Sequence, residues 1–328
     1  MRPDEEASAT STDDGAVPPA AAACGVRPGS ASPLTRRAML AATGGLLLAA
    51  CAQSTPRPSA TASGLSPSPG GPAPTPSARP TPPSPSPSAS PAPPVWPTRE
   101  QLVQEFAGRK PKKFGIVVPG VVSEGRRDIA LTFDACGGGR LGNGFDAKLI
   151  KLLEGHDVPA TLFLNGRWIE ANPTIAADLA ANPRFELANH GWEHRPLTVT
   201  GKSAYGIQGT AGPGEAYDEI VRGIDALGEV TGERSPYFRP GTAWSDDVAV
   251  ELAARLGVSV IAFTINGDAG ATAPKRAVAA NFGKAKDGSI VLAHFNRPEH
   301  ATAEGLDKAL PRLLDAGSVF ATLTAALS

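Results

Sequence analysis

From Asp128 onward, short runs rich in β-branched residues alternate with longer stretches whose apolar residues recur at the spacing of a helix. This alternation predicts seven strands, at 129–133, 160–164, 185–188, 237–239, 258–264, 290–294 and 319–323. Helices are predicted between most of them, at 147–153, 169–179, 216–227, 247–256 and 306–314. Strands that alternate with helices in this way are typical of an α/β barrel or a doubly wound sheet.

The first part of the chain lacks this pattern. About half of the 33 prolines lie between 52 and 97, in a stretch with almost no residue able to form a core. We expect 52–97 to be a disordered Pro/Ser-rich linker, which would span on the order of 140 Å when fully extended. One large domain is then predicted over 98–328.

An export signal is predicted ahead of the linker. Two arginines, Arg36 and Arg37, are followed by a short apolar run and then by Cys51. The paired arginines resemble a Tat signal, and Leu48-Ala-Ala-Cys51 resembles a bacterial lipobox, in which the cysteine becomes lipidated. We therefore expect 1–51 to be an N-terminal extension with a lipoprotein signal, and the domain to be anchored at the outer face of the cytoplasmic membrane. An ordinary signal peptide with an incidental Cys51 is the alternative, and the export route, Tat or Sec, stays open.

Charge argues against a polyanionic partner. The net charge is −1, and the globular part contains no basic patch with interleaved aromatic residues. Nucleic acid is therefore not an expected partner. No run of 18 or more consecutive apolar residues occurs, which would be expected of a permanent membrane span.

Polar residues recur where the predicted strands end. They are Asp134, Asn165, His190, Arg239, Asn266 with Asp268, and His294. In parallel α/β folds, ligands bind at the carboxyl ends of the strands, so these side chains are expected to meet there. His190 and His194 lie four residues apart, and imidazole is a common ligand of zinc, so this edge is expected to bind a divalent metal.

Four motifs resemble those of the polysaccharide deacetylase family, the NodB homology domain, over nearly all of 128–328. They are Leu131-Thr-Phe-Asp134, Asn189-His-Gly-Trp-Glu-His-Arg-Pro-Leu197, Phe238-Arg-Pro240 and Ile290-Val-Leu-Ala-His294. The resemblance implies a distorted (β/α) barrel with about seven strands. It also implies a divalent metal, often zinc, and hydrolysis of N-acetyl groups from amino-sugar polymers.

The resemblance also implies roles for single residues. His190 and His194 would bind the metal, and Asp134 would be the general base and a candidate third ligand. Arg239 would orient Asp134. His294 would be the general acid, tuned by Asp268, because an imidazole can protonate the departing amine near neutral pH.

The sequence departs from the family where the third metal ligand is expected. The first motif normally carries two adjacent aspartates, and here the second is Ala135. Asp134 itself, a replacement ligand such as Cys136 or Asp146, or water in a weakened site would fill the place. The segment after Pro240 differs too, and the loop 198–214 with Tyr205 is expected to be either a rim over the substrate groove or a flexible connector.

Three functions remain open on this basis. The first is a metal-dependent hydrolase that removes acetyl groups from cell-wall or chitin-like glycans. The second is a noncatalytic glycan-binding module on the same fold. The third is a hydrolase of another C–N (amide) bond in a small molecule.

Overall fold

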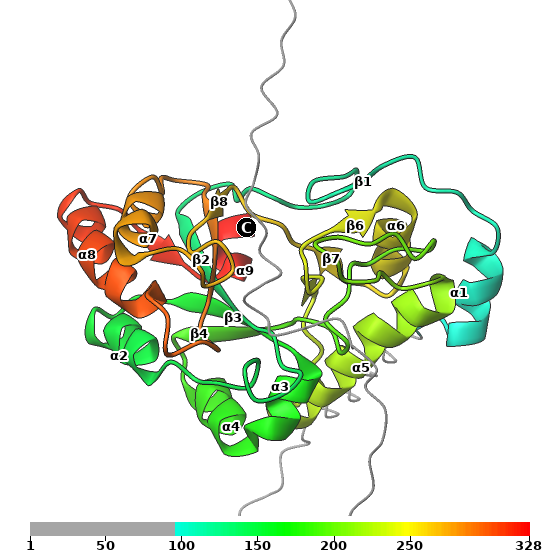
Figure 1. Ribbon diagram of the computed structural model, residues 1–328, viewed down its shortest axis with the longest axis horizontal. Helices are drawn as coiled ribbons and strands as arrows, with labels where there is room; N and C mark the ends of the chain where they lie inside the picture. The colour runs from blue at the N-terminus through cyan, green and yellow to red at the C-terminus, as the bar shows by residue number, and fades with distance from the viewer. Residues whose placement is uncertain (1–95) are drawn as a thin grey trace, which may run out of the picture. The chain divides into compact units, whose positions relative to one another are not determined.

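A curved parallel sheet forms the centre of the domain in the computed structural model, which describes residues 96–328 (Figure 1). The order of the strands along it is β7-β5-β4-β3-β2-β9-β8, and β10 pairs with the start of β2. The strands are β2 Ile129–Ala135, β3 Ala160–Leu164, β4 Phe185–Asn189, β5 Tyr237–Phe238, β7 Ser259–Val260, β8 Ile265–Asn266, β9 Ile290–His294 and β10 Phe320–Ala321. The strand path ends at β7 on one side and at β8 on the other, so the barrel is open. The expected distorted (β/α) barrel is thereby confirmed, whereas the predictions for 1–51 and for 52–95 lie outside the described residues.

One predicted strand is wrong in its extent. The run 258–264 forms only the short β7, and β8 begins after it at Ile265. The backbone between them turns its polar groups elsewhere: the carbonyl oxygens of Ile261 and Ala262 accept hydrogen bonds from the Arg239 side chain, at 3.3 and 3.2 Å. The N–H of Ala262 also donates to the carbonyl oxygen of Val122 at 2.8 Å, so the backbone here pairs outside the central sheet and the predicted strand is interrupted.

Helices surround the sheet (Figure 1). They are α1 Arg99–Phe106, α2 Ala147–Gly155, α3 Gly166–Ala171, α4 Pro173–Ala181, α5 Pro213–Thr231, α6 Asp247–Arg255, α7 Lys275–Phe282, α8 Thr302–Asp315 and α9 Leu323–Leu327. The predicted helix 169–179 is divided into α3 and α4, because Pro173 has no N–H to continue a helix and instead occupies its first turn. A small antiparallel pair, β1 Phe114–Gly115 and β6 Ser245–Asp246, was not expected.

The central strand β2 has two different faces, because side chains alternate along a strand. Ile129, Leu131, Phe133 and Ala135 belong to the core that packs against helices such as α2 and α8. Burying a Leu or Phe side chain contributes about 1.5–3 kcal/mol. The side chains between them include Asp134, which is buried on the opposite side of the strand. That side carries the polar groups described below.

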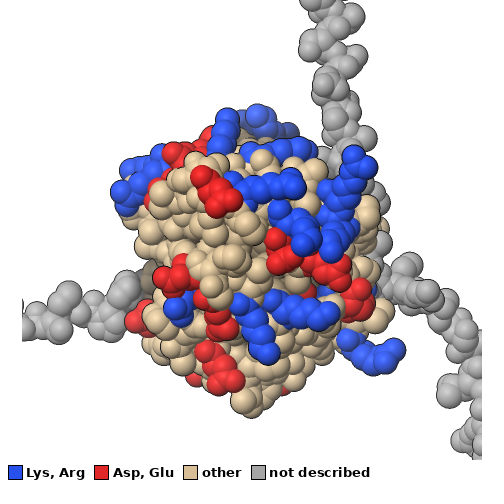
Figure 2. Space-filling view, turned by 90° about the vertical axis from the view of Figure 1, so that its left-hand side faces the viewer, with Lys and Arg blue, Asp and Glu red and all other residues tan. Residues whose placement is uncertain are grey.

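The surface shown in Figure 2 carries Lys and Arg side chains interspersed with Asp and Glu side chains. This mixture agrees with the near-zero net charge of the chain. Among residues 96–328, none of the helices combines the length and the apolar character needed to span a bilayer.

Candidate functional site

Two of the predicted site residues lie side by side on neighbouring strands. Asp134 near the end of β2 is in register with His294 at the end of β9. His190 follows the last residue of β4, and Arg239 follows β5. The carboxyl ends of these parallel strands therefore bring the expected side chains together.

Arg239 fixes the carboxylate of Asp134. Its Nη1 donates to Asp134 Oδ1 at 2.7 Å, and both side chains are buried. Its Nη2 donates to Thr132 Oγ1 at 2.9 Å, and its guanidinium lies 4.1 Å from the centre of the Phe163 ring. A planar cation held at several donors orients a carboxylate firmly, which agrees with the role expected for Arg239.

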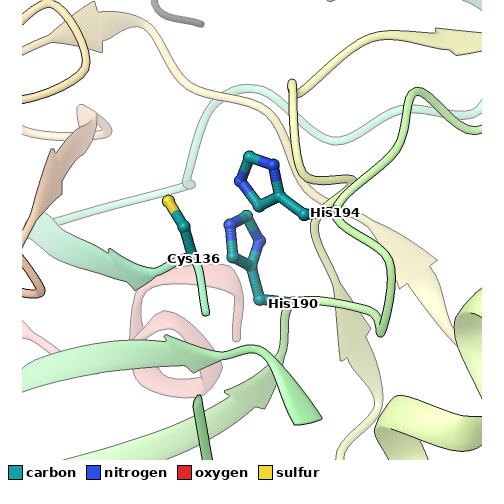
Figure 3. Close-up of side chains that lie close together, drawn as sticks. All are labelled: Cys136, His190 and His194. Atoms are coloured by element: carbon teal, nitrogen blue, oxygen red, sulfur yellow. The ribbon is translucent and has the colours of Figure 1, made fainter. Parts of the chain in front are cut away.

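The two histidines converge with Cys136 in one cluster (Figure 3). One ligand atom of each of these three residues lies within 4.8 Å of the others, and all three residues are buried. The imidazole rings of His190 and His194 meet at 83° with centres 5.1 Å apart. Burial lowers the pKa of His190 and, more strongly, that of His194, and this favours the neutral imidazole that binds metals.

His190 has the hydrogen-bond pattern of a metal ligand. Its Nδ1 lies 2.9 Å from the carbonyl oxygen of Arg239, which only accepts, so Nδ1 carries the proton. The lone pair is then on Nε2, a buried atom without a hydrogen-bond partner, 3.6 Å from Asp134 Oδ2. Metal-bound imidazoles are commonly held in this way at their second nitrogen. The residues present thus fit a divalent ion.

The direction of the Ala135 side chain bears on which residue can be the third metal ligand. Ala135 is part of the apolar core beneath the helices, so its side chain does not face the histidines. Cys136, the next residue, does join them, while Asp146 caps α2 by accepting hydrogen bonds from Lys148 and Leu149. A ligating sulfur is a thiolate, so Cys136 competes with Asp134 for the metal only when its sulfur is reduced and ionised.

His294 is paired with Asp268, as the sequence suggested. Its Nδ1 lies 2.9 Å from Asp268 Oδ1, and its backbone N–H donates to Oδ2 at 2.7 Å. Burial alone would lower the pKa of His294, but the Asp268 carboxylate outweighs it and raises that pKa above the ordinary value. The imidazolium form of His294 is therefore more stable than that of an ordinary histidine.

Glu219 on α5 is a residue of the site that the sequence analysis missed. Its buried carboxylate accepts hydrogen bonds from four consecutive backbone N–H groups, those of residues 192–195, at 3.1, 2.7, 2.9 and 3.4 Å. These bonds hold the turn in which His194 has a φ of 60°. Burial raises the pKa of Glu219, against the four amides that favour its charged form. The available signal was an acidic residue on the otherwise apolar face of α5.

A small cavity opens beside Asp134 and His294. Its volume is about 20 Å³, enough for a group the size of one water molecule or a methyl. The lining residues are Ile116, Asp134, Tyr205, Gly241, Thr242, Ala243, Phe263, Asn266, Leu292 and His294. Tyr205 therefore places part of the loop 198–214 beside this cavity, as expected for a loop that forms a rim over the site.

Other polar residues at the strand ends have structural hydrogen bonds. Asn165 caps α3 through Arg167 N and donates to the carbonyl oxygen of His190 at 3.1 Å. Asn266 accepts from Ala269 N at 2.8 Å while also lining the cavity. They shape the site around the histidines and Asp134.

Comparisons with known proteins agree with this geometry. Residues 122–261 match the family model for polysaccharide deacetylase. A peptidoglycan-N-acetylglucosamine deacetylase from Bacillus cereus is 25% identical over 206 residues, which cover 60% of this chain and 67% of that protein. The uncharacterized protein YlxY of Bacillus subtilis is 23% identical over 186 residues, 56% of this chain, and the match spans only about half, 53%, of its length.

A solved structure has the same fold. It is a CE4 family pseudoenzyme from Bacillus anthracis, with a TM-score of 0.54 and 24% identity over 65% of this chain and 70% of that one. The family match identifies residues 122–261 as part of a polysaccharide deacetylase domain, and the parallel half-barrel with its buried histidine pair agrees with this.

Proposed function

We propose that this protein is a metal-dependent hydrolase that removes N-acetyl groups from amino-sugar polymers of the cell wall or of chitin-like type. One observation supports the proposal above all: Asp134 and His294 line the same cavity, which fits a methyl-sized group. The buried imidazoles of His190 and His194 lie near it. An acetyl methyl group has that size. The peptidoglycan deacetylase among the relatives supports a glycan substrate.

The metal is proposed to be a divalent ion such as zinc, bound by His190 and His194 with Asp134 or reduced Cys136 as the third ligand. A bound ion of this kind polarises the acetyl carbonyl and lowers the pKa of bound water toward about 7. His190 is prepared for it by the hydrogen bond that fixes its Nδ1–H on the Arg239 carbonyl.

The proton transfers fall to the chain's own side chains. Arg239 holds Oδ1 of Asp134, which leaves Oδ2 on the side of His190 to accept a proton from the attacking water. His294 keeps its Nδ1 on Asp268, so its other ring nitrogen donates to the departing amine. An amine leaves readily only once it is protonated, and the raised pKa of His294 keeps that proton available.

The proposal is tested by metal analysis and acetate release on the purified protein, with and without reductant. We expect stoichiometric metal and acetate release from N-acetylated glycans, with both lost in His194→Ala. Asp134→Asn separates the roles: retained metal with lost activity makes Asp134 the base alone, whereas loss of metal makes it a ligand. Metal-loaded protein that releases no acetate from any N-acetylated glycan, beside an active control enzyme, would refute the proposal.

A noncatalytic glycan-binding module is the second candidate. Its support is that only Asp134 remains of the two adjacent aspartates implied by the family resemblance, and that a pseudoenzyme with this fold exists. It predicts glycan binding that is unchanged by His294→Ala and by metal removal. A panel of small amides alongside the glycans distinguishes the third candidate, hydrolysis of another C–N bond.

Export and lipid anchoring at Cys51 are proposed from the signal-like sequence at 36–51. A lipid-anchored domain on a long linker would reach cell-wall glycan from the outer face of the membrane. Metabolic labelling with a fatty acid tests this, because Cys51→Ala should abolish the label and release the protein from the membrane fraction. Equal labelling of the variant would refute lipidation at Cys51.

A further inference from the structure

Tyr205 lies at the tip of a tight turn that suits it poorly. Ala204 and Ile207 exchange backbone hydrogen bonds of 3.1 and 2.9 Å, and the two residues between them have φ values of 53° and 78°. Positive φ at both central positions defines the hairpin turn that favours Asn-Gly. Gly206 fits the second position, but a bulky aromatic residue rarely adopts the left-handed conformation required at the first.

The loop around this turn is held by bonds that do not involve the tyrosine ring. Gly201 N donates to the Thr210 carbonyl at 3.0 Å, and Gln208 Nε2 donates to the carbonyl of Gly201. Thr198 N donates to Thr210 Oγ1 at 2.8 Å. The loop therefore has its own support, and an asparagine at 205 would meet the demand of the turn with less strain.

The ring of Tyr205 instead faces the catalytic cavity. Tyr205 lines that cavity together with Asp134 and His294, and its side chain is only half-buried. Its ring meets Trp244 at 87° with centres 6.0 Å apart, and Trp244 is itself 5.1 Å from the ring of Phe114. These contacts fix the tilt of an aromatic ring at the mouth of the site.

The volume of the cavity limits which part of an N-acetylated sugar can enter it and which part can contact the Tyr205 ring. About 20 Å³ accepts a methyl-sized group and excludes a sugar ring. With an acetyl methyl inside, the sugar that carries it lies outside the cavity, on its solvent side, and Tyr205 is a partly exposed aromatic residue of the lining that can reach this sugar. One face of a pyranose ring consists largely of C–H groups, so it can bury apolar surface against an aromatic ring.

We propose that Tyr205 is a substrate-recognition residue, whose ring packs against the sugar that carries the reacting acetyl group. The proposal rests on the proposed function, because it assumes an N-acetylated sugar in this cavity. Strained backbone that persists beside a reactive site is consistent with such a role. The edge-to-face contact with Trp244 holds the Tyr205 ring in this position.

The test uses the complete, metal-loaded protein and two variants. Tyr205→Asn keeps a residue suited to the turn and removes the ring, whereas Tyr205→Phe keeps the ring and removes the hydroxyl. Acetate-release kinetics and calorimetric binding are measured with oligomers of N-acetylglucosamine, and the urea midpoint of each variant is recorded. We expect Tyr205→Asn to raise KM and Kd about fivefold to tenfold, with kcat changed less than about twofold and an unchanged or higher urea midpoint. Tyr205→Phe should resemble the wild type.

Each other outcome overturns the proposal. Wild-type KM and Kd in Tyr205→Asn would show that the ring does not contact the sugar, while the proposed function stands. A lowered urea midpoint that accompanies the weaker binding would make Tyr205 a structural residue. A wild-type protein that neither binds nor deacetylates the oligomers would remove the proposed function, and this proposal with it.

Discussion

Replacing Glu219 by alanine should loosen the turn that carries His194. Three of its four amide hydrogen bonds are 3.1 Å or shorter, and an unsatisfied buried donor costs about 1–3 kcal/mol. Removing the buried carboxylate also removes its desolvation cost, so we expect a net loss of about 3–5 kcal/mol. With a urea m-value of about 2–3 kcal/mol/M, the unfolding midpoint should fall by about 1–2.5 M.

Glutamine at the same position gives a sharper comparison. Oε1 of Glu219 accepts from residues 192, 194 and 195, whereas Oε2 accepts only from Glu193, which is exposed. An amide can keep the three bonds at Oε1, so Glu219→Gln should lose only about 1 kcal/mol. Its urea midpoint should lie close to that of the wild type.

Metal affinity provides the second measurement. Groups that orient a ligating histidine typically change metal affinity about 10- to 100-fold, so Glu219→Ala should weaken binding by that factor and Glu219→Gln by much less. Competition with a chelator measures this without any assay of activity. Glu229→Ala is the matched control, since Glu229 is an exposed glutamate on the same helix. If Glu219→Ala matched this control in both midpoint and affinity, the positioning role would be refuted.

Three further predictions concern other contacts of the site. Gly241→Ala should lower metal content and activity, because the added Cβ would lie 2.4 Å from backbone atoms of His194; full metal content would contradict this. Asp268→Asn should shift the alkaline limb of kcat/KM to lower pH, because burial then lowers the pKa of His294 without the opposing carboxylate; an unmoved limb would show that His294 is not the acid. Ala135→Asp should not strengthen metal binding and should lower the urea midpoint, because position 135 faces the apolar core; tighter metal binding in this variant would contradict the assignment of that face.

The sequence was sufficient where the signal was local and repeated. Strands β2, β3 and β9 were predicted from continuous apolar runs, and their polar ends identified Asp134 and His294 before their register was known. The pairing of His294 with Asp268 followed from the family resemblance and is present in the structure. Periodicity and motif spacing carry this kind of information directly.

The sequence was insufficient where distant segments decide the outcome. The run 258–264 is interrupted where its backbone binds Val122 and the Arg239 side chain, contacts that local apolar character does not reveal. Glu219 binds a turn 24 to 27 residues earlier in the chain. By motif, Ala135 occupies the place of the missing ligand. In the structure, the Ala135 side chain points into the core, and Cys136 is the residue that lies beside the histidines.

Substitutions on the two faces of β2 should have different effects, because one face packs in the core and the other carries Asp134. Odd positions from Ile129 to Ala135 pack in the core, so substitutions there should reduce the amount of folded protein recovered from cells. Asp134, on the other face, is paired with buried Arg239, so only a replacement that can still bind this guanidinium, such as asparagine, should be recovered normally while losing its chemistry. Variants of Leu131, Phe133, Ala135 and Asp134, sorted once for abundance and once for acetate release, should therefore separate the two faces, with Asp134→Asn losing acetate release alone.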